Sequence, residues 1–236
     1  MIQLPKVYDN SHAASSGRFP QHDGKPKISY SQYTSWISPI YRGAYIAQYF
    51  LGVPDDGNIF SDFGSKVGEW FEKGEDLSGD LSTTDIETLE QVGRPEGCEY
   101  EREIVLDRKK YVIQGFIDRV RPVEISPKKK GLEVIDFKTG GENKQSDYSS
   151  ENYRQTTLYS HALTLEGETV AYSGVKLLAR KGNGSENHPL RLTGQIIEIP
   201  TPYSKKRATD ALKQIDDVVE DISKHFQFYQ KFFGNN

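Results

Sequence analysis

The stretch that decides the fold lies at residues 112–138 and reads VIQGFIDRVRPVEISPKKKGLEVIDFK. Asp118 closes the run Gln-Gly-Phe-Ile-Asp, and 18 residues later Asp136 opens the run Asp-Phe-Lys. Apolar residues alternate or cluster before each aspartate, as they do in β-strands, so both carboxylates and Lys138 are expected to converge at one edge of a small sheet. Two hard oxygen donors beside an ammonium group suit a divalent metal and a phosphate.

The order of predicted elements gives the fold class. Helices are expected at about 31–37, 39–50, 60–74, 83–92, 151–165 and 203–232, and strands at about 100–106, 111–120, 132–137, 173–180 and 192–199. A helix between strands indicates a crossover, so we predict an α/β fold with a mixed central sheet flanked by helices. We expect residues 1–27 to form an irregular arm and residues 28–236 a single domain ending in the long helix.

Composition excludes several classes of protein. The chain has 236 residues and one cysteine, Cys98, so it cannot form an internal disulfide or a cysteine-bound zinc or iron–sulfur site. It lacks the roughly 18 uninterrupted apolar residues of a membrane span, and residues 1–27 do not resemble a signal peptide. We therefore expect a soluble intracellular protein. The formal charge of -4 argues weakly against an overall basic nucleic-acid binder, but a local basic groove is compatible with it.

The two aspartates have an ordinary interpretation as well as a functional one. A single aspartate at a strand end is commonly a turn or cap residue, and Asp-x-Lys on one strand is commonly a surface ion pair. Here Phe116-Ile117 precede Asp118, and Val134-Ile135 precede Asp136. Strands this apolar are expected in the interior, where a carboxylate costs several kcal/mol unless a cation or hydrogen bonds satisfy it. A metal would satisfy both carboxylates.

Three ordered motifs carry a family resemblance. Gly115-Phe116-Ile117-Asp118, Asp136-Phe137-Lys138 and Gln155-Thr156-Thr157-Leu158-Tyr159 follow one another in strand, strand and helix contexts. Their order and spacing resemble the motif set of PD-(D/E)XK nucleases of the RecB-like branch. The resemblance spans about residues 28–180 and implies a restriction-endonuclease-like core.

The resemblance implies roles for the strand residues. Asp118, Asp136 and the backbone carbonyl of Phe137 would be the ligands of Mg²⁺ or Mn²⁺, which activates water and relieves phosphate charge. Lys138 lies two residues beyond Asp136 on an extended strand and shares its face, so its ammonium could orient the attacking water or stabilise the phosphate. A simple salt bridge between Lys138 and Asp136 is the alternative.

The predicted helix at 151–165 would add DNA contacts. Gln155 and Tyr159 are four residues apart and share a helix face. Alone they would be an ordinary polar–aromatic pair, but in this order they resemble the Gln-x-x-x-Tyr motif that contacts DNA and braces the site. Arg154 beside them would add a phosphate contact.

The chain departs from the family pattern in the helix that precedes the strands. Many RecB-like members place a metal-binding histidine four residues after the glycine that opens this helix, and here that position is Gly68. Glu72 is a candidate replacement on helical phase and Glu69 on proximity, while a plain solvated glutamate is the alternative for each. The four-cysteine iron–sulfur cluster of some relatives cannot form in this chain.

These motifs predict a metal-dependent DNA nuclease. The length and the lack of a recognisable sequence-reading domain favour an exonuclease in DNA recombination, repair or phage DNA processing. The alternatives are a structure-specific or single-strand endonuclease and, in another class, a catalytically inactive DNA-binding subunit. DNA is the expected partner, with a homo-oligomer or a recombination protein as a compatible second one and no membrane. The expected location is the cytoplasm of a bacterial or phage-infected cell.

Overall fold

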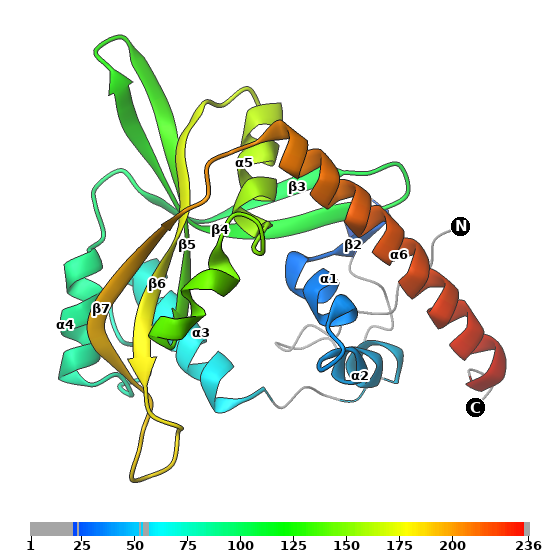
Figure 1. Ribbon diagram of the computed structural model, residues 1–236, viewed down its shortest axis with the longest axis horizontal. Helices are drawn as coiled ribbons and strands as arrows, with labels where there is room; N and C mark the ends of the chain where they lie inside the picture. Colours follow the sequence, from blue (N-terminus) through cyan, green and yellow to red (C-terminus); the bar gives the residue numbers. More distant parts are fainter. Residues whose placement is uncertain (1–20, 23, 52, 54–56, 234–236) are drawn as a thin grey trace. The chain divides into compact units, whose positions relative to one another are not determined.

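The computed structural model describes residues 21–22, 24–51, 53 and 57–233, and its elements are labelled in Figure 1. The chain divides into two compact units. The first comprises Met1–Asp56, Val105–Gly115 and Thr209–Asn236, and the second comprises Gly57–Ile104 and Phe116–Ala208. Each unit is described by itself below, and the prediction of a single domain over 28–236 stays a prediction.

A mixed sheet forms the centre of the second unit. Its strands are β4 (Val112–Ser126), β5 (Lys129–Gly140), β6 (Val170–Lys181) and β7 (Arg191–Pro200), and β3 (Glu99–Asp107) pairs with β4. β4 and β5 form an antiparallel hairpin, β5 and β6 are parallel, and β6 and β7 are antiparallel. The parallel pair exists because α5 (Gln155–Leu165) lies between its strands in the chain as a crossover. The predicted mixed α/β architecture is confirmed.

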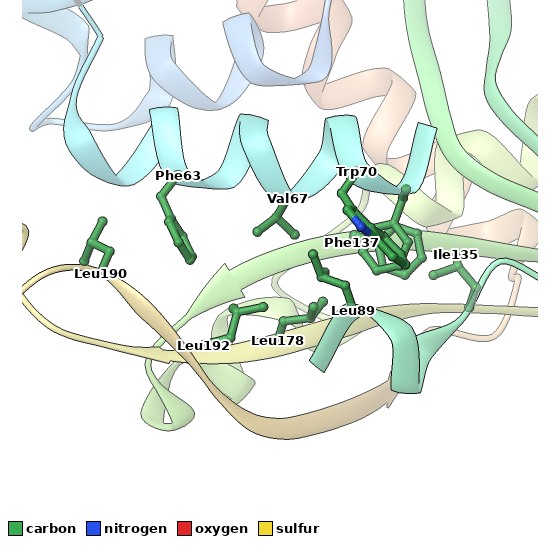
Figure 2. Packing of buried hydrophobic residues seen from close by; sticks show 10 residues of the cluster. Phe63, Val67, Trp70, Leu89, Ile135, Phe137, Leu178, Leu190 and Leu192 are labelled. Carbon is green, nitrogen blue, oxygen red and sulfur yellow. The ribbon is translucent and has the colours of Figure 1, made fainter. Parts of the chain in front are cut away.

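Two helices of this unit share a hydrophobic core with the sheet. α3 (Ile59–Lys73) and α4 (Thr83–Val92) have the predicted spans, and α3 ends at Gly74, whose left-handed φ of 88° favours glycine. Figure 2 shows the side chains of α3 pointing toward those of the sheet. The ring of Phe71 stacks on that of Phe137 with centroids 3.9 Å apart. The apolar residues that recur every three or four positions along α3 therefore face the core.

The side chains of β5 alternate between two faces, one in the core and one at the candidate site. Ile135 and Phe137 belong to the cluster beneath α3 (Figure 2). Successive side chains of a strand point to opposite faces, so Asp136 and Lys138 lie on the other face. There Asp136 contacts Tyr153, which immediately precedes the start of α5. One strand thus contributes to the core with alternate residues and to the site with the others.

Ser82 and Asp85 cap α4. Ser82 is the N-cap residue and forms a reciprocal capping box with Asp85, although Thr84 with Glu87 three residues later matches the same sequence pattern. Asp85 is fully buried, and its Oδ1 accepts a 2.6 Å hydrogen bond from the backbone N–H of Leu192 on β7. Because the β7 contact is tertiary, it selects one of two equally plausible capping boxes.

The second unit also contains the 3-10 helix η3 (Glu142–Tyr148), and further elements belong to the first unit. They are β1 (Gln21–His22), β2 (Lys25–Ile28), α1 (Tyr30–Ile37), α2 (Arg42–Tyr45), the π-helix η2 (Ile46–Phe50) and, from Thr209 onward, α6 (Lys205–Phe233). Within it, Trp36 Nε1 donates to Asp221 Oδ2 of α6 at 2.9 Å. The predicted long C-terminal helix is confirmed.

Two predictions in the first unit need correction. The irregular arm was expected over residues 1–27, but β2 begins at Lys25 and pairs in parallel with β4, placing Lys27 beside Val112 and the buried Ile28 beside Ile113. Residues 1–20 lie outside the described residues. The helix expected at 39–50 begins only at Arg42, whose backbone N–H donates to the Ser38 carbonyl and whose Nε donates to the Trp36 carbonyl. Within the described part of the chain, every helix is too short or too polar to cross a bilayer.

Candidate active site

The strands β4 and β5 separate at the two aspartates. Their ladder runs from Ser126 opposite Lys129 to Arg119 opposite Ile135, so Asp118 and Asp136 are the next opposed residues. At this point the backbone N–H of Phe137 donates to Asp118 Oδ2 at 2.6 Å. A side chain thus takes the hydrogen bond next to the end of the ladder. The structure brings together the two carboxylates that the sequence predicted to converge.

The Asp136 carboxylate is completely buried and is satisfied on one oxygen only. Its Oδ2 accepts hydrogen bonds from Lys138 Nζ at 2.6 Å and from the Tyr153 hydroxyl at 2.9 Å. Its Oδ1 is buried and has no hydrogen-bond partner among the described residues. An unsatisfied charged oxygen in the interior is costly, and most such atoms in native proteins have a donor or a cation. Oδ1 is therefore suited to bind a cation.

The ammonium group of Lys138 is held by the two residues that precede it on β5. Besides the contact with Asp136, its Nζ donates to the carbonyl oxygen of Phe137 at 3.1 Å. Burial favours the neutral amine, but the carboxylates of Asp136 and Asp118 outweigh burial and raise the pKa of Lys138. The side chain therefore carries a full positive charge at neutral pH. The salt bridge between Lys138 and Asp136, given above as the alternative interpretation, is present, and the catalytic role of Lys138 stays a prediction.

Asp118 has a strongly perturbed carboxyl group. Burial, followed by the nearby Asp136 carboxylate, raises its pKa to about 7, against the opposing effects of Lys138 and the Phe137 N–H. Two carboxylates in one low-dielectric site cannot both ionise easily. A divalent cation would remove this conflict because it stabilises both ionised forms.

The residues Asp118, Asp136 and Phe137 fit a hard divalent metal. They supply two carboxylates and a backbone carbonyl, the oxygen ligands that Mg²⁺ and Mn²⁺ prefer. The buried Oδ1 of Asp136 provides an oxygen without a competing donor in the described structure. The two carboxylates are not joined by a third ligand side chain, since no group of three or more His, Cys, Asp or Glu residues in the described structure could hold a metal.

The start of α5 carries a chain of polar contacts to the site. Gln155 Nε2 donates to the hydroxyl of Tyr159, and the Tyr153 hydroxyl contacts Gln155 Oε1 as well as Asp136. Burial, with a smaller contribution from the Asp136 carboxylate, raises the pKa of Tyr159, so its hydroxyl stays protonated. The structure therefore connects the predicted Gln155–Tyr159 pair to Asp136 through Tyr153. Arg154 is the N-cap residue of α5 and is partly buried.

Tyr153 is a site residue that sequence reasoning missed. It lies in the run Glu-Asn-Tyr-Arg, which the sequence assigned to the helix at 151–165 but which precedes the observed start of α5 at Gln155. Its ring lies edge-to-face with that of Tyr148, with centroids 5.4 Å apart, and 5.7 Å from Lys138 Nζ. The only signal was its position two residues before Gln155, which does not predict contact with a strand.

Glu101 is the second residue that was missed. In the described structure it is the only non-glycine residue with a positive φ, at 52°, and such a conformation costs about 1–3 kcal/mol. Local burial raises the pKa of its carboxyl, and the carboxylates of Glu72 and Asp136 add to this effect, although the residue as a whole remains exposed. A glutamate in the polar run Tyr-Glu-Arg-Glu gives no sequence signal of this environment.

The helix-borne candidates have weaker connections to the site. Glu72 pairs with Lys73, and its charge acts on Glu101. Glu69 is partly buried and acts electrostatically on Lys73. A Cβ placed at Gly68 would meet nothing within 4 Å, so a larger side chain has room there. Metal binding by Glu72 or Glu69 stays a prediction.

Comparisons with known proteins assign this arrangement to a family. The sequence model of the PD-(D/E)XK nuclease superfamily matches residues 58–231. A solved structure described as a "putative exonuclease" from Eubacterium rectale has the same fold, with 14% identity, a TM-score of 0.51, and coverage of 92% of this chain and 87% of that one. The solved structure of SSO0001 is 16% identical, with a TM-score of 0.43 and coverage of 82% and 75%. No curated protein matches the chain significantly in sequence.

Proposed function

Since the chain belongs to the PD-(D/E)XK nuclease superfamily, we propose that it is a metal-dependent deoxyribonuclease and, more specifically, an exonuclease. The observation that carries the proposal is the fully buried Asp136 carboxylate, whose Oδ1 has no partner in the described structure. A second carboxylate, Asp118, lies opposite it where the strands separate. This donor set matches the metal and phosphate chemistry of phosphodiester hydrolysis.

The chain supplies the parts that this reaction needs. Bound by Asp118, Asp136 and the Phe137 carbonyl, Mg²⁺ or Mn²⁺ supplies Lewis acidity and lowers the pKa of a water molecule. Lys138 keeps its positive charge beside both carboxylates and can stabilise the charge that develops on the phosphate. Asp118 holds a proton near pH 7 in the absence of a cation, so metal binding and loss of this proton are coupled.

The α5 residues have bracing and DNA-binding roles in this proposal. Gln155 and Tyr159 contact one another, and Gln155 contacts Tyr153, so they support the site from within. Arg154 at the N-terminus of α5 is the residue we assign to a DNA phosphate. The exposed Lys128, Lys129 and Lys130 at the tip of the β4–β5 hairpin are further candidates for phosphate contacts.

The finer assignments belong to the same proposal. The order of the three motifs supports the RecB-like branch, and the description of the Eubacterium rectale protein agrees with an exonuclease. We propose a role in DNA recombination, repair or phage DNA processing, in the cytoplasm of a bacterial or phage-infected cell. A homo-oligomer or a recombination protein is the second partner to test after DNA.

Two alternatives remain to be separated by experiment. A structure-specific or single-strand endonuclease would use the same residues and the same metal chemistry. An inactive DNA-binding subunit would explain Gly68 at the position of the family histidine. The contact between Asp136 and Lys138 favours an active enzyme, because both groups serve hydrolysis rather than DNA binding alone.

End-labelled linear DNA and covalently closed circular DNA separate these functions when incubated with Mg²⁺, Mn²⁺ or EDTA. We expect metal-dependent degradation of linear DNA only, which Asp136→Ala and Lys138→Ala abolish. Asp147→Ala is the matched control, since Asp147 is exposed and pairs with Lys144. Nicking of circles would establish the endonuclease. DNA binding without metal-dependent cleavage, unchanged by Asp136→Ala, would establish the inactive subunit.

A further inference from the structure

Tyr153 is placed next to the site by a turn that precedes α5. Its backbone N–H donates to the Ser149 carbonyl at 2.8 Å, which fixes the direction of the chain. Its ring packs with that of Tyr148 against a small apolar cluster. This cluster consists of Val175, Leu177 and Ile199, and the partly buried Ile197 packs against it as well. The ring is therefore held by apolar contacts that do not require the hydroxyl group.

The Tyr153 hydroxyl reaches the same oxygen of Asp136 as Lys138. Both donors bind Oδ2, at 2.9 Å and 2.6 Å respectively, while Oδ1 is buried without a partner in the described structure. Two donors on one oxygen fix the rotation of the carboxylate about its Cβ–Cγ bond. The two oxygens of the Asp136 carboxylate therefore differ: Oδ2 accepts the contacts from the protein, and Oδ1 keeps its lone pairs.

We propose that Tyr153 is a positioning residue that orients Asp136 so that Oδ1 is presented to the metal; this inference rests on the proposed function. Hydrogen bonds to the non-coordinating oxygen of a ligating carboxylate orient it and tune its affinity. The ammonium group of Lys138 cannot keep its full hydrogen bond to Asp136 while it also interacts with a phosphate. Tyr153 is then the donor that keeps Oδ2 in place during the reaction.

The contact with Gln155 ties this role to the helix motif. A phenol has one hydrogen, and the charged Asp136 carboxylate is its stronger acceptor. The structure places Gln155 Oε1 at the Tyr153 hydroxyl and Gln155 Nε2 at the Tyr159 hydroxyl. Exchange of the two amide atoms would let Gln155 donate to Tyr153 and accept from Tyr159, which leaves the single hydrogen of Tyr153 for Asp136.

The decisive variant removes the hydroxyl alone. Tyr153→Phe keeps the ring that packs on Tyr148, and thermal unfolding and circular dichroism verify that it folds. The readout is the dissociation constant for Mn²⁺, measured by isothermal titration calorimetry on the full chain without DNA. We expect it to rise by about 10- to 100-fold, the usual effect of losing a hydrogen-bond partner of a metal ligand.

The matched control is Tyr148→Phe. Tyr148 belongs to the same ring pair, but the structure gives its hydroxyl no hydrogen bond to Asp136. We expect it to bind Mn²⁺ as the wild type does. An equal loss of affinity in both variants would attribute the effect to the ring pair and would overturn the role assigned to the Tyr153 hydroxyl.

A second background tests the geometry independently. In Lys138→Met the Tyr153 hydroxyl is the remaining donor to Asp136 Oδ2, so adding Tyr153→Phe should weaken Mn²⁺ binding by a larger factor than in the wild type. An unchanged dissociation constant for Tyr153→Phe in both backgrounds would overturn the inference and leave the nuclease intact. If the wild type neither binds Mn²⁺ nor cleaves DNA, the proposed function fails, and the inference fails with it.

Discussion

The ammonium group of Lys138 lies 2.6 Å from Asp136 Oδ2 and 3.1 Å from the carbonyl oxygen of Phe137. The family resemblance assigns Asp136 and the Phe137 carbonyl to the metal, so the ammonium group occupies the neighbourhood of two expected metal ligands. Metal binding must therefore act against a positive charge that the site holds close by. The same charge is needed later, at the phosphate.

Lys138→Met is expected to separate metal binding from catalysis. Removing the ammonium group relieves its repulsion of the cation, and we expect Mn²⁺ to bind about tenfold more tightly, which corresponds to about 1.4 kcal/mol. Cleavage of linear DNA should fall by about 100-fold or more, as it does when one charge-stabilising donor is removed. Calorimetry and a single-turnover cleavage assay measure the two effects.

Lys176→Met is the control for this prediction. Lys176 is a lysine of the same sheet that pairs with Glu198 at 2.7 Å, and we place it outside the site. It should change neither metal affinity nor cleavage. Weaker Mn²⁺ binding in Lys138→Met would contradict the expected repulsion between the ammonium group and the cation, because it would mean that Lys138 organises the metal ligands.

The raised pKa of Asp118 makes stability depend on pH. Its pKa is about 7 in the folded protein and 3.8 in the reference state, so the folded state holds the proton more tightly. The stabilisation is complete below about pH 4 and is lost as pH rises through about 7. In EDTA the melting temperature should therefore decline over this range through this group, and Asp118→Asn should reduce that decline.

Metal binding should release the same proton. At pH 7 the Asp118 carboxyl is about half protonated, so binding of Mg²⁺ should release about half a proton. Calorimetry in two buffers of different ionisation enthalpy measures the release. A release near zero at pH 7, or one that persists in Asp118→Asn, would assign the proton to a different group.

Replacing Glu101 with glycine should raise the stability of the protein and weaken its metal binding. Glycine adopts the positive φ of 52° without strain, so Glu101→Gly should be stabilised by about 0.5 kcal/mol in urea denaturation, even after the added entropy of the unfolded chain. It should also bind Mn²⁺ about threefold more weakly, because a carboxylate that acts on Asp136 is lost. Glu103→Gly on the same strand has no positive φ to relieve and should be destabilised by about 1 kcal/mol. Equal destabilisation of both variants would rule out strain at Glu101.

Gly68→His tests whether the helix can supply another ligand. The position has open space around a Cβ, so the substitution should not disturb packing. Imidazole favours Ni²⁺ over Mg²⁺, and we expect Ni²⁺ to bind about tenfold more tightly with Mg²⁺ affinity almost unchanged. Gly68→Ala also removes the helical glycine but adds no ligand, so it serves as the control. Unchanged Ni²⁺ affinity would show that the helix position does not reach the site.

Local patterns predicted most of the secondary structure in the second unit. The three- and four-residue apolar period of α3 and the alternation of β5 each define one buried face, so spans and faces follow from the sequence. The errors occurred where tertiary contacts decide between local alternatives. Ser82 and Asp85 cap α4 because Asp85 also accepts a hydrogen bond from the Leu192 N–H, and β2 is a strand because Ile28 is buried beside Ile113. Neither contact can be predicted from the local sequence pattern.

The sequence by itself determined the pair of aspartates and Lys138. Apolar runs that end at Asp118 and Asp136 predict strands whose carboxylates converge at one edge of a sheet, and a period of two places Asp136 and Lys138 on one face, so this half of the site follows from spacing. Only the tertiary structure decided what surrounds Asp136. The packing of the turn before α5 brings Tyr153 to Oδ2, and the positive φ of Glu101 places its carboxylate where it acts on the site. Both depend on how separate segments pack, which no residue spacing encodes.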